Sequence, residues 1–526
     1  MPPVARAVAL SVLVTLGLAA RTAAPTALAT SAPPAATSVP RAATSAPAAP
    51  SAPPAAPPPT PLLKLSPCDL EHPVHLTLLT AECGVLPVLE NPHDASGRRI
   101  GLFVARVAAI SRRKRPDPLF ILAGGPGAAA SAFYVTVAPA FARILRQRDI
   151  VLVDQRGTGN SNRLDCAQEE DLLYRATNAE IAARTRACLA ALAQRADVRW
   201  YTTSIAVQDL EQVRAALGYG RINLYGTAYG TRVALQYLRR FAPRVRSLIL
   251  DGVLPVEQPL GPATAIDAEH ALLAIFTRCA DEPPCRTRFG DPAADYHTVR
   301  AALKVSTVPV SVRDPVTGED TPFEFGADHL GTVLRLLSYT PEHAALLPLL
   351  LHAAAEREDY APLAAQFLLA ERTYGEIVAT GMHNSVVCAE DVPFFDAHAI
   401  DRQALAATYL GTRQLDRLQT VCRLWPHGPV DADLHAPLVS DLPALLLSGS
   451  DDPLTPPKYA REVEQGLRHS LSVVLEGFGH GQLTAPCVDR VMAQFLEQAS
   501  VSGLDVSCTL QARPMPFFTS LNGPPP

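Results

Sequence analysis

Short apolar runs alternate with amphipathic stretches over two parts of the chain. The expected strands lie at 99–108, 118–122, 149–153, 222–225 and 245–250 in the first part, and at 444–448 and 472–475 in the second. The expected helices lie at 138–146, 204–217, 231–241, 457–466 and 488–498. Short, continuously apolar strands that alternate with helices are typical of a buried parallel sheet. The pattern therefore predicts a doubly wound α/β domain.

A different pattern occupies residues 258–436. Ala- and Leu-rich segments at 263–277, 344–355 and 361–370 favour helices, and strand signals are few. Pro348 is expected to kink or restart the second of these helices, while Pro362 suits the first turn of the third. The sequence thus predicts a largely helical insertion, the cap, between two parts of an α/β core at 65–257 and 437–510.

The two ends of the chain differ from the rest in composition. Arg6 precedes an apolar run at 8–18, and small residues follow it, so residues 1–29 are expected to be a signal peptide. The apolar run is short for a membrane anchor. Residues 30–64 are mostly Ala, Pro, Ser and Thr and are expected to form a disordered linker. Residues 511–526 are expected to be a tail that is loosely held from Arg513 onward.

Ten cysteines point to an oxidising compartment, and hence to a secreted or periplasmic protein. Their order suggests five local disulfides, although sequence alone leaves other pairings open: Cys68–Cys83, Cys166–Cys188, Cys279–Cys285, Cys388–Cys422 and Cys487–Cys508. No C-x-x-C pair or histidine cluster accompanies them, so the sequence indicates neither a metal site nor a cofactor. A net charge of −5 with scattered arginines provides no basic surface for nucleic acid.

The sharpest chemical signal is Tyr225-Gly226-Thr227-Ala228-Tyr229-Gly230-Thr231, which lies between an expected strand and an expected helix. This is the layout of a nucleophile elbow, a tight turn that lifts one side chain above the sheet. Its two glycines allow strand and helix to approach closely, and the N–H of Tyr229 would face a developing oxyanion. The residue at the nucleophile position is Ala228, whose methyl group cannot attack a carbonyl carbon.

Two later segments supply an acid and a base in the chain order of a catalytic triad. Asp452 follows the strand at 444–448, and His480 lies in a glycine-containing loop after the next strand. In such a triad the acid orients the imidazole, which takes the proton of the nucleophile. The loop at 123–127, Ala-Gly-Gly-Pro-Gly, also follows a strand and is expected to form the second half of the oxyanion hole. It lacks the lysine of a phosphate-binding loop.

Together these motifs resemble those of a known group of enzymes. Residues 124–127, 154–161 (Asp-Gln-Arg-Gly-Thr-Gly-Asn-Ser) and 225–232 are similar to successive signatures of the prolyl and tripeptidyl aminopeptidases of the α/β-hydrolase fold, and 445–508 resembles their C-terminal region. The resemblance implies an exported serine peptidase that removes residues from a free peptide N-terminus. It also implies that Asp452 and His480 are triad members and that Gly125 and Tyr229 are the oxyanion donors.

Substrate recognition is expected to involve acidic residues of the cap. A free N-terminus is an ammonium, for which a partly buried carboxylate is the natural partner. Glu390 is the first candidate and Asp391 the second. Asp154 and Arg156 are expected to be structural, with the guanidinium holding loop carbonyls. Relatives usually have histidine at position 123, and Ala123 is expected to change loop packing more than chemistry.

Three functions are compatible with this sequence. The first is an aminopeptidase scaffold that is inactive, or stops at substrate binding, because Ala228 replaces the nucleophile. The second is a natural pseudohydrolase that binds peptides or small molecules without turnover. The third is an esterase, lactonase or amidase on the same fold. The expected partner in each case is a peptide or a small amide or ester, with no stable membrane insertion.

Overall fold

A nine-stranded sheet is the centre of the fold in this computed structural model, which describes residues 63–73, 75–166, 176–313 and 317–524. The expected signal peptide at 1–29, and all of the expected linker except its last two residues, lie outside the described residues. The strand order is β1-β2-β3-β5-β4-β6-β7-β10-β11, antiparallel from β1 to β5 and parallel from β5 to β11. The strands are β1 (Ser66–Glu71), β2 (Leu78–Leu89), β3 (Arg99–Val107), β4 (Leu119–Leu122), β5 (Ile150–Val153), β6 (Ile222–Thr227), β7 (Val245–Asp251), β10 (Ala444–Gly449) and β11 (Ser470–Leu475).

Both faces of the parallel part of the sheet are covered, which explains why its strands are apolar at successive positions. In β4, Phe120 and Leu122 belong to one hydrophobic cluster, whereas Leu119 and Ile121 belong to the cluster on the opposite face. The helices on the first face are α5 (Thr203–Ala216), α6 (Tyr229–Phe241) and α17 (Pro457–Glu464); on the second they are α1 (Ala130–Val137), α2 (Ala142–Leu145) and α18 (Val488–Gln498). Helix α4 (Asn178–Leu192) packs against α16 (Arg413–Cys422). The predicted α/β fold class is confirmed.

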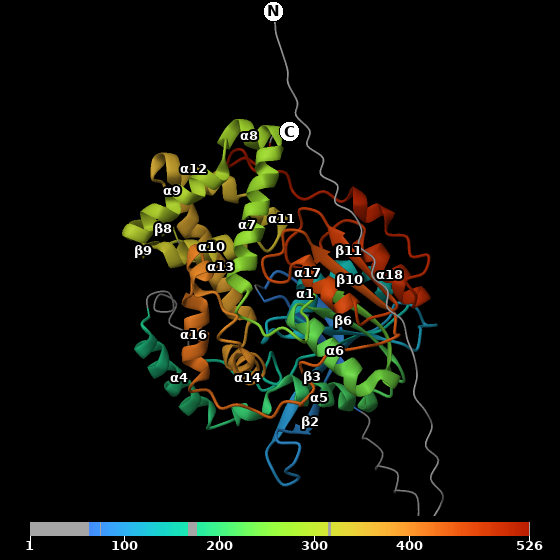
Figure 1. Ribbon diagram of the computed structural model, residues 1–526. Coiled ribbons are helices and arrows are strands. Elements are labelled where there is room, and N and C mark those ends of the chain that lie inside the picture. The colour runs from blue at the N-terminus through green and yellow to red at the C-terminus, as the bar shows by residue number, and fades with distance from the viewer. Residues whose placement is uncertain (1–62, 74, 167–175, 314–316, 525–526) are drawn as a thin grey trace, which may run out of the picture. The chain divides into compact units, whose positions relative to one another are not determined.

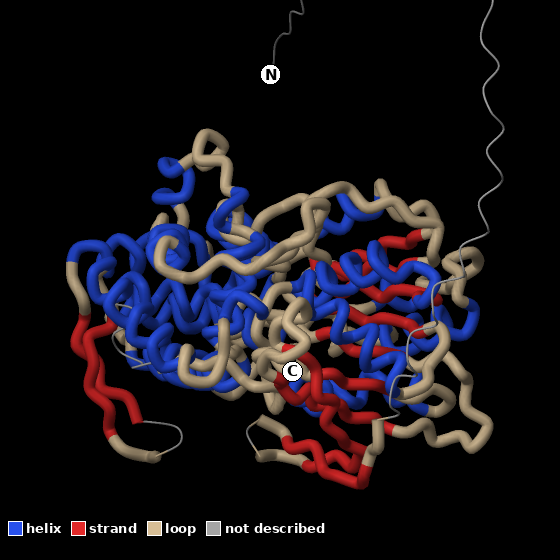
Figure 2. The backbone as a smooth tube through the Cα atoms, turned by 90° about the horizontal axis from the view of Figure 1, so that it is seen from below, coloured by secondary structure: helices blue, strands red, loops and turns tan. Residues whose placement is uncertain are grey.

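The cap lies beside the sheet rather than on its faces (Figures 1 and 2). It also contains a two-stranded antiparallel sheet that the sequence did not predict, because these strands are only half buried and lack a continuous apolar run: β8 (Val308–Arg313) and β9 (Asp320–Phe325). Its helices are α7 (Thr264–Asp281), α8 (Pro283–Phe289), α9 (Pro292–Val305), α10 (Ala327–Leu337), α11 (Pro341–Ala344), α12 (Leu347–Arg357), α13 (Ala361–Ile377) and α15 (Arg402–Ala407). Pro348 lies in the first turn of α12, so the helical segment restarts there.

The expected insertion at 258–436 is not one packing unit. Helices α14 (Thr380–Glu390) and α16 (Arg413–Cys422) are joined by the disulfide Cys388–Cys422. Both cysteines, with Met382 of α14 and the neighbouring Trp425, are buried in the hydrophobic cluster of the sheet domain. Helices α7 to α13 share a separate cluster, and α15 contributes Leu405 to a third, small one with Ala265 and Leu415. The segment that carries Glu390 and Asp391 therefore belongs structurally to the α/β core.

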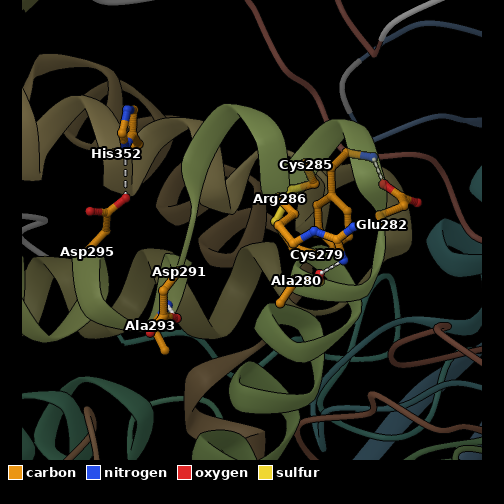
Figure 3. The surroundings of a disulfide bond; sticks show 10 residues. Cys279, Ala280, Glu282, Cys285, Arg286, Asp291, Ala293, Asp295 and His352 are labelled. Atoms are coloured by element: carbon orange, nitrogen blue, oxygen red, sulfur yellow. Dashed lines mark hydrogen bonds and ion pairs between the residues drawn. A yellow bond between two sulfur atoms is a disulfide. The ribbon is translucent and has the colours of Figure 1, made fainter. Parts of the chain in front are cut away.

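All ten cysteines are paired, and the pairs are the five that their order suggested. Figure 3 shows the bond between Cys279, near the end of α7, and Cys285 in α8. Nearby, Arg286 donates to the carbonyl oxygen of Ala280. Disulfides of this number are typical of oxidising compartments. Within the described ranges, no helix has both the length and the apolar character needed to cross a membrane.

The C-terminal tail packs against the cap, which corrects the expectation that 513–526 is loosely held. Phe517 is 1% exposed and lies in the hydrophobic cluster of the cap. The N–H of Phe518 donates to the carbonyl oxygen of Ala345 at 3.0 Å. The guanidinium of Arg278 lies 4.4 Å from the centre of the Phe517 ring. Burial of the aromatic ring holds the segment in place.

Replacing the buried ring tests this attachment. Phe517→Leu removes apolar volume and the ring beneath Arg278, and is expected to lower the free energy of unfolding by about 1–2 kcal/mol. Leu521→Ala is the matched control in the same tail: Leu521 is 85% exposed, so its loss is expected to stay within about 0.5 kcal/mol. Urea unfolding of the oxidised protein measures both values, and equal effects would contradict the attachment.

Candidate active site

The elbow has the backbone geometry that the sequence predicted. Ala228 connects β6 to α6 with φ 50° and ψ −122°, a left-handed conformation that costs a non-glycine residue free energy. A Cβ atom added to Gly226 would lie 2.3 Å from the carbonyl oxygen of Gly230. One added to Gly230 would lie 2.2 Å from the carbonyl oxygen of Leu122. Only glycine fits at either position, so the strained turn is built into the crossing of helix and strand.

The glycine loop after β4 reaches the nucleophile position. A Cβ atom on Gly124 would lie 3.2 Å from the Cβ of Ala228. Gly125 has φ +106° and Gly127 has φ +113°, conformations that glycine adopts readily. The loop that contains Gly125 and the first residue of α6, Tyr229, therefore both adjoin Ala228. This arrangement suits two backbone donors for an oxyanion.

Asp452 and His480 form a pair in which the carboxylate is buried and the imidazole is partly buried. The Nδ1 atom of His480 lies 2.9 Å from Oδ2 and 3.1 Å from Oδ1 of Asp452. The carboxylate is 1% exposed and also accepts hydrogen bonds from the backbone N–H groups of Leu454 and Thr455 and from the Thr455 hydroxyl, each at 2.8 Å. Because Nδ1 is engaged by the acid, Nε2 is the nitrogen left for proton transfer.

Asp452 and His480 each favour the charged form of the other. Burial acts to raise the pKa of Asp452, but the charge and hydrogen bond of His480 and the backbone donors outweigh it, so this pKa lies below its ordinary value. Burial acts to lower the pKa of His480, but the charge and hydrogen bond of Asp452 outweigh it, so this pKa is raised. An imidazolium formed during proton transfer is thus stabilised by a partner already in place.

The elbow and the imidazole meet across the end of β7. The N–H of Ala228 donates to the carbonyl oxygen of Asp251 at 2.9 Å. The next residue is Gly252, and a Cβ atom there would lie 3.1 Å from Cε1 of His480. The structure therefore brings the nucleophile position, the acid and the base to one end of the parallel strands, where ligands bind in open α/β sheets.

Asp154 and Arg156 both have structural surroundings. Asp154 is fully buried and accepts hydrogen bonds from the N–H and hydroxyl groups of Ser131 and from the N–H of Asn160. Arg156 donates to the carbonyl oxygens of Glu90, Leu89 and Trp200. It also makes a buried ion pair with Asp209, at 2.6 and 2.9 Å, that the sequence analysis missed.

Glu390 is fully buried at the end of α14. Its carboxylate accepts hydrogen bonds from the N–H of Thr203 at 2.5 Å and from its hydroxyl at 2.7 Å. The Thr203 hydroxyl also lies 2.6 Å from that of Tyr229, the residue after Ala228. Burial raises the pKa of Glu390 to about 7. The Thr203 hydroxyl therefore connects Glu390 to the side chain of Tyr229, a connection that the sequence analysis also missed.

Asp391 has a different partner, and this corrects its place as second candidate for an ammonium ligand. Its Oδ1 accepts a hydrogen bond from Nη1 of Arg232 at 2.8 Å and from the N–H of Leu260 at 2.7 Å. Both side chains of this ion pair are fully buried. The carboxylate is neutralised by a cation of the protein, so it offers no free charge to a substrate.

The chain matches two family models: the alpha/beta hydrolase fold over residues 117–278, and TAP-like protein over residues 407–508. It is 26% identical over 315 residues to serine protease Hip1 of Mycobacterium tuberculosis, covering 56% of this chain and 59% of that relative. The chain thus spans about three fifths of the length of Hip1.

Two further relatives differ in the length of the match. Tripeptidyl aminopeptidase of Streptomyces lividans is 28% identical over 192 residues, which is 33% of this chain and 35% of the relative. Carboxylesterase B of Mycobacterium tuberculosis is 26% identical over 469 residues, which is 82% of this chain and 86% of the relative. On the two family models and these homologues, the chain belongs to the α/β-hydrolases and has a TAP-like C-terminal region, homologous to serine protease Hip1 and to tripeptidyl aminopeptidase.

Proposed function

We propose that the chain is an exported serine-peptidase scaffold of the aminopeptidase type that binds peptides but does not turn them over through an acyl-enzyme. The observation that carries the proposal is the hydrogen-bonded Asp452–His480 pair beside an elbow that lacks only a hydroxyl group. The five disulfides support export. Homology to serine protease Hip1 and tripeptidyl aminopeptidase supports a peptide substrate.

With serine at position 228, these residues would carry out acyl transfer. The hydroxyl oxygen would attack the peptide carbonyl carbon while Nε2 of His480 takes its proton, and the N–H groups of Tyr229 and Gly125 would stabilise the oxyanion. The imidazolium would then protonate the leaving amine, and water would release the acyl group by the same steps. Ala228 removes the first bond-forming atom but leaves the groups that bind and polarise the carbonyl.

We further propose that Glu390 binds the ammonium group of the substrate. Its carboxylate accepts hydrogen bonds from Thr203, whereas Asp391 accepts one from Arg232. Its connection through Thr203 to the hydroxyl of Tyr229, the residue after Ala228, supports this role. A carboxylate at a short distance from the scissile bond would select peptides with a free N-terminus.

A substitution in a serine-restored chain, Ala228→Ser, tests this role. Glu390→Gln is expected to lower kcat/KM for peptides with a free N-terminus by roughly 10–100-fold, the effect of losing one charge-assisted hydrogen bond. N-acetylated peptides serve as the control, because their cleavage does not use the charge. Equal losses for free and acetylated peptides would contradict the assignment.

The pKa of Glu390 sets the pH dependence of this interaction. Below pH about 7 the carboxyl group is protonated and cannot pair with an ammonium, so KM for free peptides is expected to fall as the pH rises through 7. KM should rise again near pH 8, because the ordinary pKa of a peptide α-ammonium group is roughly 8 and the group loses its charge there. Glu390→Gln is expected to remove the change in KM near pH 7.

A second candidate, ester hydrolysis, is favoured by the alignment with Carboxylesterase B, which covers most of both chains. A panel of dipeptide and tripeptide anilides, N-acetylated anilides and short-chain aryl esters distinguishes the two in the Ala228→Ser protein. Preference for free tripeptide anilides supports the aminopeptidase, and preference for esters replaces it. No turnover of either class, together with calorimetric binding of peptides to both proteins, would favour the natural pseudohydrolase.

A further inference from the structure

A second buried carboxylate, that of Asp251, lies where the elbow meets the His480 loop. Asp251 is the last residue of β7 and is fully buried. Its side chain accepts a hydrogen bond from the hydroxyl of Tyr225 at 2.7 Å and from the N–H of Gln482, 2.9 Å from each carboxylate oxygen. Its backbone carbonyl accepts from the N–H of Ala228. One residue thus contacts both the nucleophile position and the base loop.

These contacts restrict the His480 loop on both sides. Gln482 is two residues after His480, and its side chain donates to the carbonyl oxygen of Gly479 at 2.8 Å. On the cap side, the N–H of His480 donates to the carbonyl oxygen of Tyr339 at 2.6 Å. The position of the imidazole therefore depends on one anchor in the core, Asp251, and one in the cap.

The charge of Asp251 also reaches the imidazole. Burial lowers the pKa of His480, and the charge and hydrogen bond of Asp452 raise it. The negative charge of Asp251 raises this pKa further. The other charged group facing His480 is Arg335 of α10, which lowers this pKa. Burial raises the pKa of Asp251 to about 6; the hydrogen bonds from Gln482 and Tyr225 and the charge of His480 oppose this rise, and the charge of Asp452 adds to it.

We propose that Asp251 is a positioning residue for the base: it holds the His480 loop against the elbow, and its negative charge stabilises the imidazolium. Only the identity of His480 as the base rests on the proposed function. In the reaction a proton would move from the hydroxyl oxygen at position 228 to Nε2 of His480. Asp452 accepts the direct hydrogen bond from Nδ1. Asp251 takes no proton and acts through its hydrogen bond from the Gln482 backbone and through the electrostatic attraction of its negative charge.

The first experiment uses the chain as it is, with Ala228, and needs no catalysis. The titration of His480 is followed by NMR in the ¹³C-histidine-labelled protein, with its signal assigned by its absence in His480→Gln. Asp251→Asn is nearly isosteric and removes the charge, and is expected to lower the pKa of His480 by about one pH unit. Tyr225→Phe removes one hydrogen bond to Asp251 but keeps the charge, and should change this pKa much less.

The second experiment measures catalysis in Ala228→Ser. Asp251→Asn is expected to lower kcat about tenfold, the equivalent of one pH unit in the stability of the imidazolium, with KM within about twofold. The base must be neutral to accept a proton, so a lower pKa of His480 moves the acidic limb of the pH–rate profile to lower pH. A loop that was only loosened would lose activity without this shift.

An unchanged pKa of His480 in folded Asp251→Asn overturns the proposal. If that variant does not fold, ¹³C-aspartate labelling of the parent chain decides instead: the carboxyl identified by its shift in Tyr225→Phe should lose its proton at a lower pH than His480 does, and a carboxyl that stays protonated through the titration of His480 overturns the proposal. A lack of turnover in Ala228→Ser would count against the proposed function alone, because both titrations are independent of it.

Discussion

Ala228→Ser is expected to raise the turnover of the preferred substrate by about a million-fold, the loss that removal of a triad nucleophile typically causes. The expectation depends on how little else is missing. The strained turn, the two glycines that permit it and the hydrogen-bonded Asp452–His480 pair are all present. A serine hydroxyl adds a single oxygen atom to a methyl group that already lies at this position. Initial rates on the anilide and ester panel measure the change.

Two controls separate restored chemistry from contaminating activity. In Ala228→Ser the fluorophosphonate label should attach at position 228, and the parent chain should not be labelled. Adding His480→Gln to Ala228→Ser should return turnover to roughly the level of the parent, because triad members act as a unit. Steady hydrolysis by the parent chain that resists fluorophosphonates would contradict the prediction.

Arg232→Met is expected to lower the free energy of unfolding by about 3–5 kcal/mol, because it leaves the carboxylate of Asp391 buried without its cation. Both side chains are fully buried, and Arg232 also donates to the carbonyl oxygen of Gln258 at 2.8 Å. The pair joins α6, which begins at the elbow, to the end of α14. Urea unfolding of the oxidised protein measures the loss.

Two further variants make this prediction specific. Arg240→Met on the same helix also removes an arginine paired with aspartates, Asp431 and Asp433, but this group is partly exposed. Its loss is expected to cost about 1 kcal/mol or less. Adding Asp391→Leu to Arg232→Met removes the stranded charge and should recover much of the stability. A cost for Arg232→Met no larger than that of Arg240→Met would show that the buried pair is not needed.

The parallel part of the fold was readable from the chain because burial on both faces makes its strands continuously apolar. Strands β1 and β2 were missed for the opposite reason: they lie at the antiparallel edge, where many of their side chains are exposed and polar residues interrupt the apolar ones. Helices α14 and α16 were recognised as part of a helical segment but placed with the cap. They pack against the sheet domain, and the local periodicity of a helix does not show which part of the protein it packs against.

The candidate site shows the same division. Position 228, Asp452 and His480 could be identified because their short motifs occur in a fixed chain order and each local turn requires particular residues. Asp251 gave one weak signal, an acid directly after an apolar strand. Its side chain contacts Gln482, which is 231 positions away, and its carbonyl oxygen contacts Ala228, which follows another strand. No local sequence pattern could reveal these contacts.

The sequence by itself determined the parallel part of the sheet, the elbow and the missing hydroxyl, since backbone strain and continuous apolar runs involve only a few neighbouring residues. Only the tertiary structure decided the surroundings of the acidic residues. Glu390 and Asp391 are adjacent in the chain, yet Glu390 is bound by Thr203 and Asp391 is neutralised by Arg232. The role of a carboxylate depends on which donors and charges surround it, and these arrive from distant segments only when the chain has folded.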